Sequence, residues 1–215
     1  RHILLTGPVG TGKTSIGMMI PEIFGDSESK YVSEEFTATN DWTTQDIIGG
    51  IFPKMRNEHD VMFDIQYGCV TETVLQNWEN GVDQGKRTNS FRKDEDGILQ
   101  IVKGIWLVID EFNRADIDKA FGQLFTALRT KKLKIPTNIA TKSYLDLKIP
   151  EDYRIIGTLN TSDKHYLFEL SDALKSRFAH VEIEIPSKKE KDQEIFFALK
   201  NAAQEIEYDF EDYFQ

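Results

Sequence analysis

The sequence predicts an α/β fold, built on a parallel sheet with helices on both faces. Strand-like apolar runs alternate with helical runs along the chain, which is the pattern of such a fold. A glycine-rich turn at residues 7–14 joins the first strand-like run to the first helical one. A fully apolar run at 105–109 ends in two carboxylates, as expected of a buried strand whose carboxyl end borders a site.

The glycine-rich turn Gly7–Thr14 fills every position of the phosphate-loop pattern G-x-x-x-x-G-K-[ST]. It follows the apolar run Ile3–Thr6 and precedes the helix-compatible run Ser15–Ile20, the context that this loop requires. Backbone N–H groups and the helix N-terminus would bind phosphate, Lys13 would reach the β- and γ-phosphates, and the Thr14 hydroxyl would bind Mg²⁺. We therefore predict a nucleoside-triphosphate site made by Gly7, Pro8, Val9, Gly10, Thr11, Gly12, Lys13, Thr14 and Ser15.

Length and composition fit one soluble α/β domain. The chain has 215 residues, of which 40% are apolar and 29% charged. No apolar run approaches the roughly 20 residues that span a bilayer, and no signal peptide is visible, so we expect no membrane partner and a cytoplasmic location. The single cysteine, Cys69, excludes an internal disulfide framework and is interpreted as a buried bystander.

The net charge of −10 argues against nucleic acid binding over the whole surface. Two local basic segments remain as candidates, Lys86-Arg87 with Arg92-Lys93 and Lys131-Lys132 with Lys134. Charge runs of this kind are more often solvated faces than binding sites, and that is our interpretation of both.

The elements follow in a simple order. An amphipathic helix is predicted from the spacing of Ile117, Phe121, Leu124, Phe125 and Leu128. A second helix begins at the S-x-x-E capping box of Ser187 and Glu190. The strands are predicted at Ile3–Thr6, Phe36–Thr39, Trp106–Asp110, Arg154–Leu159 and His180–Ile185.

Two segments do not fit a plain strand–helix alternation. The interval Gly49–Lys103 holds a helical stretch, Val70–Trp78, and a polar loop, Gly81–Gly97. A structureless loop of that length would be unusual, so we predict an inserted element that carries function or partner contacts. The segment Lys132–Leu147 alternates short runs and predicts a hairpin.

The run 105–109 is followed by Asp110 and Glu111, which supply the second half of an active site. Asp110 would hold Mg²⁺ beside Thr14, and Glu111 would polarise the attacking water. Asn160 follows the apolar run 155–159 and could orient that water, or equally form a turn. Nothing matches a guanine-specifying N-K-x-D element, which favours ATP over GTP as the cofactor with Mg²⁺.

Taken together, these motifs resemble those of AAA+ ATPases. Their residue sequences are similar to those of the MoxR and McrB branch, which also includes dynein-related domains. The resemblance covers about residues 3–185 and rests on Asp110–Ala115 (DEFNRA), Ile156–Lys164 (IGTLNTSDK) and Asp172–Phe178 (DALKSRF). Within this branch, the motif sequences are most similar to those of McrB-type members.

The resemblance implies a P-loop NTPase core with a five-stranded parallel sheet in the order 5-1-4-3-2. Residues 49–103 would be the helix-2 insert and 132–147 the hairpin before sensor 1. Asn160 would act as sensor 1, and Arg177 as the arginine finger that reaches the nucleotide of the adjacent subunit. The core would span residues 1–186, with residues 187–215 starting a truncated helical lid and acidic tail, as in a fragment of a longer protein.

The implied activity is Mg²⁺-dependent ATP hydrolysis, with GTP as the alternative nucleotide, in a ring that is hexameric in such families. The ring would act on a macromolecule, either protein or DNA. One output is a McrB-like restriction or defence motor with a nuclease partner. The other is a MoxR-like chaperone that remodels proteins or inserts metal cofactors, with a metal-binding-domain partner. A nucleotide switch without turnover is disfavoured by the intact Glu111.

Overall fold

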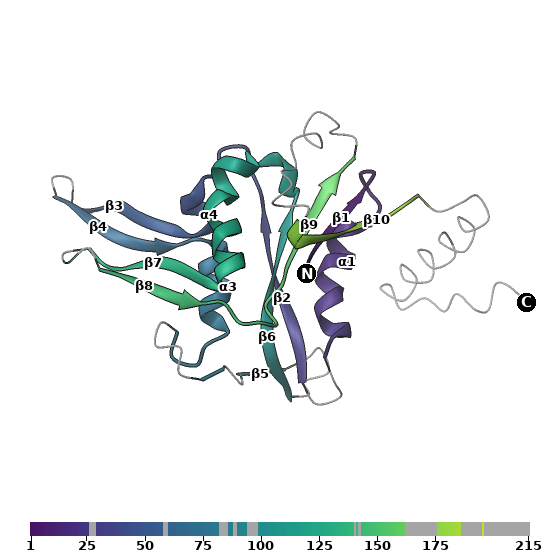
Figure 1. Ribbon diagram of the computed structural model, residues 1–215, viewed down its shortest axis with the longest axis horizontal. Coiled ribbons are helices and arrows are strands. Elements are labelled where there is room, and N and C mark those ends of the chain that lie inside the picture. Colours follow the sequence, from purple (N-terminus) through teal and green to yellow (C-terminus); the bar gives the residue numbers. More distant parts are fainter. Residues whose placement is uncertain are drawn as a thin grey trace, which may run out of the picture. The chain divides into compact units, whose positions relative to one another are not determined.

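Five parallel strands form the main sheet in the order β10-β1-β9-β6-β2 (Figure 1). The computed structural model describes residues 1–25, 29–57, 60–81, 86–87, 90–93, 99–139, 141, 143–161, 176–185 and 195. Numbered along the chain, this is the predicted order 5-1-4-3-2, which is confirmed. The five strands are β1 (His2–Gly7), β2 (Ser29–Thr37), β6 (Leu99–Asp110), β9 (Ile155–Asn160) and β10 (Phe178–Glu182).

Several predicted strand boundaries were wrong. The second and third strands begin at Ser29 and Leu99, well before the predicted Phe36 and Trp106. The first half of each strand contains polar residues, so a prediction based on apolar runs did not include it. A short antiparallel strand, β5 (Ser90–Lys93), pairs with the start of β6 and lies inside the segment predicted to be a loop. The fourth strand is shifted by one residue, and the fifth is Phe178–Glu182 rather than His180–Ile185.

Alternate residues of the strands build two separate cores, as the pleat requires. Leu4, Leu107 and Ile109 belong to the larger core on one face. Leu5 and Val108 belong to the smaller core on the other face. The sheet is therefore covered on both sides, which explains why its central strands are apolar throughout.

Helix α1 (Lys13–Ile23) covers the smaller core, and helices α3 (Cys69–Gln76) and α4 (Ile117–Thr130) cover the larger one (Figure 1). Helix α1 packs closely on the sheet at Gly17, where an added Cβ would lie at van der Waals distance from two strands, 3.4 Å from Ile156 and 3.5 Å from Val108. Asp116 caps α4 by accepting a bond from the Lys119 N–H at 3.1 Å. All five apolar residues that predicted α4 are buried.

Two hairpins extend from the α3–α4 side and lie side by side (Figure 1). The pair β7 (Lys132–Asn138) and β8 (Ser143–Lys148) confirms the predicted hairpin. The pair β3 (Gly49–Asn57) and β4 (Asp60–Tyr67) was not predicted as strands. It follows the short helix α2 (Thr44–Ile47) and precedes α3, so the insert contains a hairpin and a helix.

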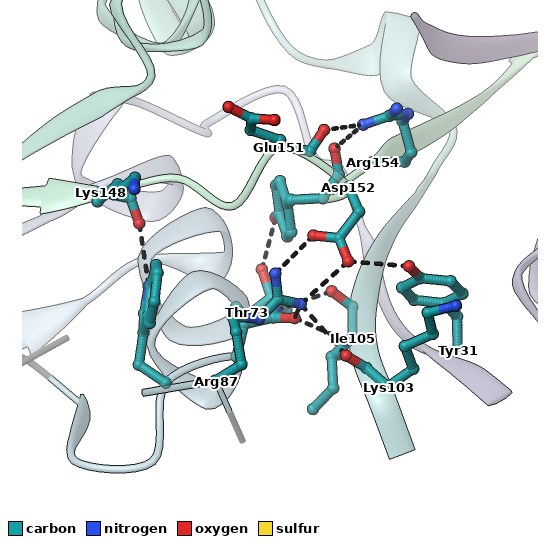
Figure 2. A network of polar contacts seen from close by, with 12 residues as sticks. Tyr31, Thr73, Arg87, Lys103, Ile105, Lys148, Glu151, Asp152 and Arg154 are labelled. Carbon is teal, nitrogen blue, oxygen red and sulfur yellow. Dashed lines mark hydrogen bonds and ion pairs between the residues drawn. The ribbon is translucent and has the colours of Figure 1, made fainter. Parts of the chain in front are cut away.

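A polar network fixes the insert to the end of the sheet away from the phosphate loop (Figure 2). Arg87 donates to both carboxylate oxygens of Asp152, at 2.6 and 3.2 Å, and Tyr31 donates to the same group at 2.8 Å. Burial alone would raise the pKa of Asp152, but these bonds hold it below its usual value. Asn77 joins the network through Arg87 and the β6 backbone at Ile105. Arg87 is thus a structural cation rather than part of a solvated basic face.

By its contacts the chain divides into two units, Arg1–Ile183 and Glu184–Gln215. The named strands and helices all belong to the first unit. The capping box at Ser187 and Glu190 lies outside the described residues, as do Ser162–Lys164 and Asp172–Lys175. Within the part of the chain that is described, no helix has the length and apolarity needed to cross a membrane.

Candidate functional site

The phosphate loop connects β1 to α1 with a backbone that only glycine adopts easily. Gly10 and Gly12 have φ angles of 81° and 73°, and an added Cβ at either would meet nothing within 4 Å. Conformation, rather than space, therefore selects glycine at both positions. Gly12 is the N-cap of α1, and no side chain bonds the helix N-terminus there among the described residues. The first N–H groups of α1 are thus available to an anion.

Lys13 lies over this loop rather than in solvent. Its ammonium donates to the Pro8 carbonyl at 2.6 Å and contacts the Thr11 hydroxyl at 3.5 Å. The side chain is only 5% exposed. Burial lowers the pKa of Lys13, and the nearby Asp110 carboxylate partly opposes this shift. A phosphate at the loop would give this buried ammonium a negatively charged partner.

Two hydroxyls from different elements meet one carboxylate oxygen beneath the loop. Thr14 on α1 donates to Oδ1 of Asp110 at 2.6 Å, and Thr158 on β9 donates to the same atom at 2.5 Å. Thr158 also accepts the Glu111 N–H at 3.0 Å. The fold thus brings together the predicted metal ligands, Thr14 and Asp110, from positions 96 residues apart.

The chemistry of Thr14 and Asp110 fits a magnesium ion. Hydroxyl and carboxylate oxygens are hard ligands, and Mg²⁺ is usually held by one or two protein groups plus phosphate oxygens and water. These two oxygens already converge beside the phosphate loop, so little rearrangement would be needed to share a cation.

Glu111 stands at the sharp turn that ends β6. Its backbone adopts the left-handed conformation, with φ 52° and ψ 40°, which is uncommon for a residue with a Cβ and costs free energy. Its carboxylate forms an ion pair with Arg114, Nε to Oε2 at 2.8 Å, and the Glu111 side chain is 21% exposed. The turn therefore directs an accessible carboxylate, with a defined partner, out of the sheet.

Asn160 ends β9 beside the start of the phosphate loop. Its Cα partner on β1 is Gly7, and the next residue, Thr161, donates its N–H to the Gly7 carbonyl at 3.0 Å. The structure thus places the predicted water-orienting amide at the same edge of the sheet as Asp110 and Glu111, because β9 lies between β1 and β6.

Arg177 lies at the other end of the sheet. It immediately precedes β10, whose first residue, Phe178, pairs with His2 at the beginning of β1. The phosphate loop begins where β1 ends, and strands rise about 3.3 Å per residue, so the length of β1 separates Arg177 from that loop by roughly 15 Å or more. Arg177 bonds Ser176 Oγ at 3.2 Å. It is the one predicted site residue that the fold does not bring to the loop of its own chain.

The sequence reasoning missed Thr158 and Arg114 as members of this site. Thr158 reads as an ordinary strand residue, although its position two residues before Asn160 puts it on the same face of β9. Arg114 was included only as part of a family motif, without a partner. The spacing i, i+3 from Glu111 was the available signal for their ion pair.

No curated protein matches the chain. A solved structure of a candidate ATPase from Cytophaga hutchinsonii is 19% identical, with a TM-score of 0.47, and the match covers 93% of this chain and 46% of that one. NtrX from Brucella abortus is 14% identical, with a TM-score of 0.42, over 94% of this chain and 37% of that one. The chain spans less than half the length of either structure, and at these values neither adds to the functional argument.

The family match is more extensive. The model of the AAA domain, dynein-related subfamily, matches residues 2–178, a stretch that includes the phosphate loop, Asp110, Glu111 and Asn160. This stretch contains every strand of the main sheet up to the first residue of β10. The chain therefore belongs to the dynein-related subfamily of AAA domains.

Proposed function

We propose that this chain is the ATP-hydrolysing module of a ring-forming machine that remodels or moves a macromolecule. AAA domains in general hydrolyse ATP, which supports the proposed reaction. It does not indicate which macromolecule the hydrolysis would act on. The observation that carries the proposal is the meeting of Thr14 with Asp110 beneath an intact phosphate loop, with Glu111 at the next position. Phosphoryl transfer needs this combination of phosphate binding, metal binding and a carboxylate base.

Each residue would have a distinct task in hydrolysis. The N–H groups at the start of α1 and the Lys13 ammonium would hold the β- and γ-phosphates. Thr14 and Asp110 would hold Mg²⁺, which neutralises developing negative charge when bound. Glu111 would accept the proton of the attacking water, and Asn160 would fix the direction of that water.

Arg177 would complete the site of a neighbouring subunit. Its place at the opposite end of β1 from the phosphate loop supports a role in trans, since it is too far from its own loop. A permanently charged guanidinium there could stabilise the transferring phosphoryl group of the adjacent nucleotide. Hydrolysis would then depend on ring assembly, which is the basis for proposing self-association.

Two biological roles are compatible with this ATP-hydrolysing module. Residues 110–115 resemble the MoxR and McrB branch as a whole, and the resemblance of residues 156–164 to McrB-like members supports a restriction or defence motor that moves DNA with a nuclease partner. A MoxR-like role in protein remodelling, with a metal-binding-domain partner, is favoured by a structural observation. Exposed apolar side chains gather on the β3–β4 hairpin, among them Met55, Val61 and Phe63.

Two substitutions test the hydrolytic proposal. Lys13→Ala should abolish binding of a fluorescent ATP analogue, because the loop loses its cation. Glu111→Gln should keep binding and lose turnover, since an amide cannot accept the proton of water. Glu22→Gln, an exposed change on α1, serves as the control for the loss of one carboxylate. Normal binding by Lys13→Ala, or normal steady-state hydrolysis by Glu111→Gln, would contradict the proposal.

A further inference from the structure

A hollow of about 240 Å³ lies at the beginning of helix α4. Its wall combines Asn40, which follows β2, with residues 113–118, which run from the turn after β6 into the first turn of α4. Strands β2 and β6 are parallel neighbours, and the Ala38 N–H donates to the Asp110 carbonyl at 2.9 Å, so both loops leave the sheet at the same edge. We call this cavity, lined by Asn40 and residues 113–118, the α4 hollow.

Asn113 lines the α4 hollow with an amide that has no hydrogen-bond partner. The residue is 2% exposed, and neither its Nδ2 nor its Oδ1 bonds another group. Buried amides are nearly always paired, because an unpaired one has lost its hydrogen bonds to water without replacement. Asn113 therefore lacks an acceptor for Nδ2 and a donor for Oδ1, and a ligand in the hollow would supply both.

Two carboxylates on the wall carry uncompensated negative charge. Asp116 caps α4 by accepting the Lys119 N–H, and Asp118 follows in the first turn. Among the described residues, neither Asp116 nor Asp118 forms an ion pair. The cation on the wall, Arg114, is already bonded to Glu111 at 2.8 Å. The α4 hollow therefore attracts a cation and repels a phosphate.

A guanidinium fits this wall better than a metal ion does. It is planar, always charged and weakly hydrated, so it tolerates the buried apolar residues Ala115 and Ile117 beside it. Its forked N–H donors match the oxygens of carboxylates and of an amide. A metal ion would leave Nδ2 of Asn113 without an acceptor. The described residues also contain no group of three His, Cys, Asp or Glu side chains that could hold such an ion.

The amide nitrogen of Asn113 indicates that the guanidinium belongs to a polypeptide. A guanidinium has donors only, so it satisfies Oδ1 and leaves Nδ2 unpaired. A backbone carbonyl of the same ligand would be the missing acceptor. The hollow is also smaller than the 300–1,000 Å³ or so of a small-molecule pocket, and it suits one side chain with its adjoining backbone.

We propose that the α4 hollow binds an arginine residue of a polypeptide, with the guanidinium at Asp116 and Asp118 and a backbone carbonyl at Asn113. This goes beyond the proposed function, since the binding needs neither ATP nor its hydrolysis. It is also separate from the role proposed for Arg177, because the bound arginine meets carboxylates rather than a nucleotide phosphate.

The test is an NMR titration of the full chain, without nucleotide, with Nα-acetyl-arginine-methylamide. The amide signals of residues 113–118, including the side-chain amide of Asn113, should shift with a dissociation constant of about 1 mM. The citrulline analogue has the same shape without the charge and should bind about tenfold more weakly, since it loses the charge-assisted bonds. Propylguanidinium, which lacks the carbonyl, should bind about threefold more weakly.

Substitutions locate the site. Asp118→Asn should weaken the arginine compound by about tenfold. Glu22→Gln is the matched control, because it removes an exposed carboxylate from α1, and it should leave the affinity within twofold. Asn113→Leu should also weaken binding by about tenfold without lowering the urea midpoint, because leucine leaves no buried polar atom unpaired. Since nucleotide is absent, a failure of ATP binding would contradict the proposed function and leave this result unchanged.

Light scattering distinguishes two sources of the arginine. If a second copy of the chain supplies it, Asp118→Asn and the arginine compound should both disperse the parent's self-association; if another protein supplies it, neither should. Any of three results would overturn the inference. The citrulline analogue binds as tightly as the arginine compound, Asp118→Asn binds as tightly as the parent, or no signal of residues 113–118 shifts at up to about 20 mM compound.

Discussion

Thr158 donates its hydroxyl to Oδ1 of Asp110 at 2.5 Å, from the strand next to the one that carries the carboxylate. The same hydroxyl accepts the N–H of Glu111 at 3.0 Å. One side chain therefore holds both the predicted metal ligand and the backbone of the predicted base. The left-handed backbone of Glu111 depends on such support, because strained conformations persist only where neighbouring contacts fix them.

Thr158→Val tests this support with little change in shape. The substitution leaves the Glu111 N–H without its acceptor and should cost about 1–3 kcal/mol of unfolding free energy. Hydrolysis should fall more than ATP binding, since the phosphate loop is untouched. Denaturant unfolding and steady-state ATPase assays measure the two effects. Thr126→Val, an exposed change on α4, is the control, and identical behaviour of the two variants would remove Thr158 from the site.

The ion pair between Arg114 and Glu111 leads to a second prediction. A carboxylate oxygen bonded to a guanidinium is a poorer proton acceptor, so Arg114→Ala should raise turnover at saturating ATP. The pair is partly exposed, at 57% and 21%, and such pairs contribute about 0.2–1 kcal/mol. The increase should therefore not exceed about fivefold.

Arg129→Ala, an exposed arginine in the last turn of α4, controls for the loss of one cation. A fall in turnover specific to Arg114→Ala would mean that the ion pair positions Glu111 for catalysis instead of competing for it. High salt should reproduce part of the Arg114→Ala effect, since exposed ion pairs are screened.

His2 leads to a prediction about pH. It is 6% exposed, and its Nδ1 accepts the N–H of Ile155 at 3.0 Å, which requires the neutral ring. Burial, with nearby Lys131 and Arg154, lowers the pKa of His2 to about 3. Between about 3 and 6.5 the unfolded chain binds a proton that the folded chain does not. Stability should therefore fall as the pH drops below about 6.5, by no more than roughly 5 kcal/mol from this group.

Urea unfolding of the parent chain and His2→Asn at pH 7 and pH 5 checks this linkage. The asparagine oxygen can replace Nδ1 as an acceptor but does not titrate in this range. His2→Asn should therefore lose part of the stability difference between the two pH values, while His180→Asn, at an exposed position, should keep it. An unchanged difference in His2→Asn would assign the pH dependence to other groups.

Strong local patterns account for what could be predicted from the sequence. The phosphate loop, the apolar half of β6 and the apolar stripe of α4 have distinctive residues at fixed spacing, and the resemblance to AAA+ domains supplied the strand order. Cross-strand contacts such as that of Thr158 with Asp110 depend on register, which no local pattern contains. For the same reason Arg87 looked like a surface cation until the fold placed Asp152 beside it.

The β3–β4 hairpin shows a different limit. Its alternation of apolar residues was present in the sequence, but Pro53 and the paired glycines 49–50 disfavoured a strand. Alternation also ordinarily means that the apolar side is buried against a second layer. Here Met55, Val61 and Phe63 are exposed, and only the three-dimensional arrangement reveals it.

The last prediction concerns Arg177. Its distance from the phosphate loop of its own chain means that an arginine-finger role must be exercised on a neighbour, so the defect must be complementable in trans. Arg177→Ala subunits should bind ATP normally and fail to hydrolyse it, with a loss of about 10³–10⁵ by analogy with other arginine fingers. Mixed with Glu111→Gln subunits they should regain activity, because some interfaces then combine an intact Arg177 with an intact Glu111. Activity should peak at intermediate mixing ratios. Crosslinking should first show that the rings contain both kinds of subunit. If activity then stays unchanged at all mixing ratios, Arg177 is not an arginine finger acting on a neighbour, because a role within one subunit predicts no recovery at any ratio.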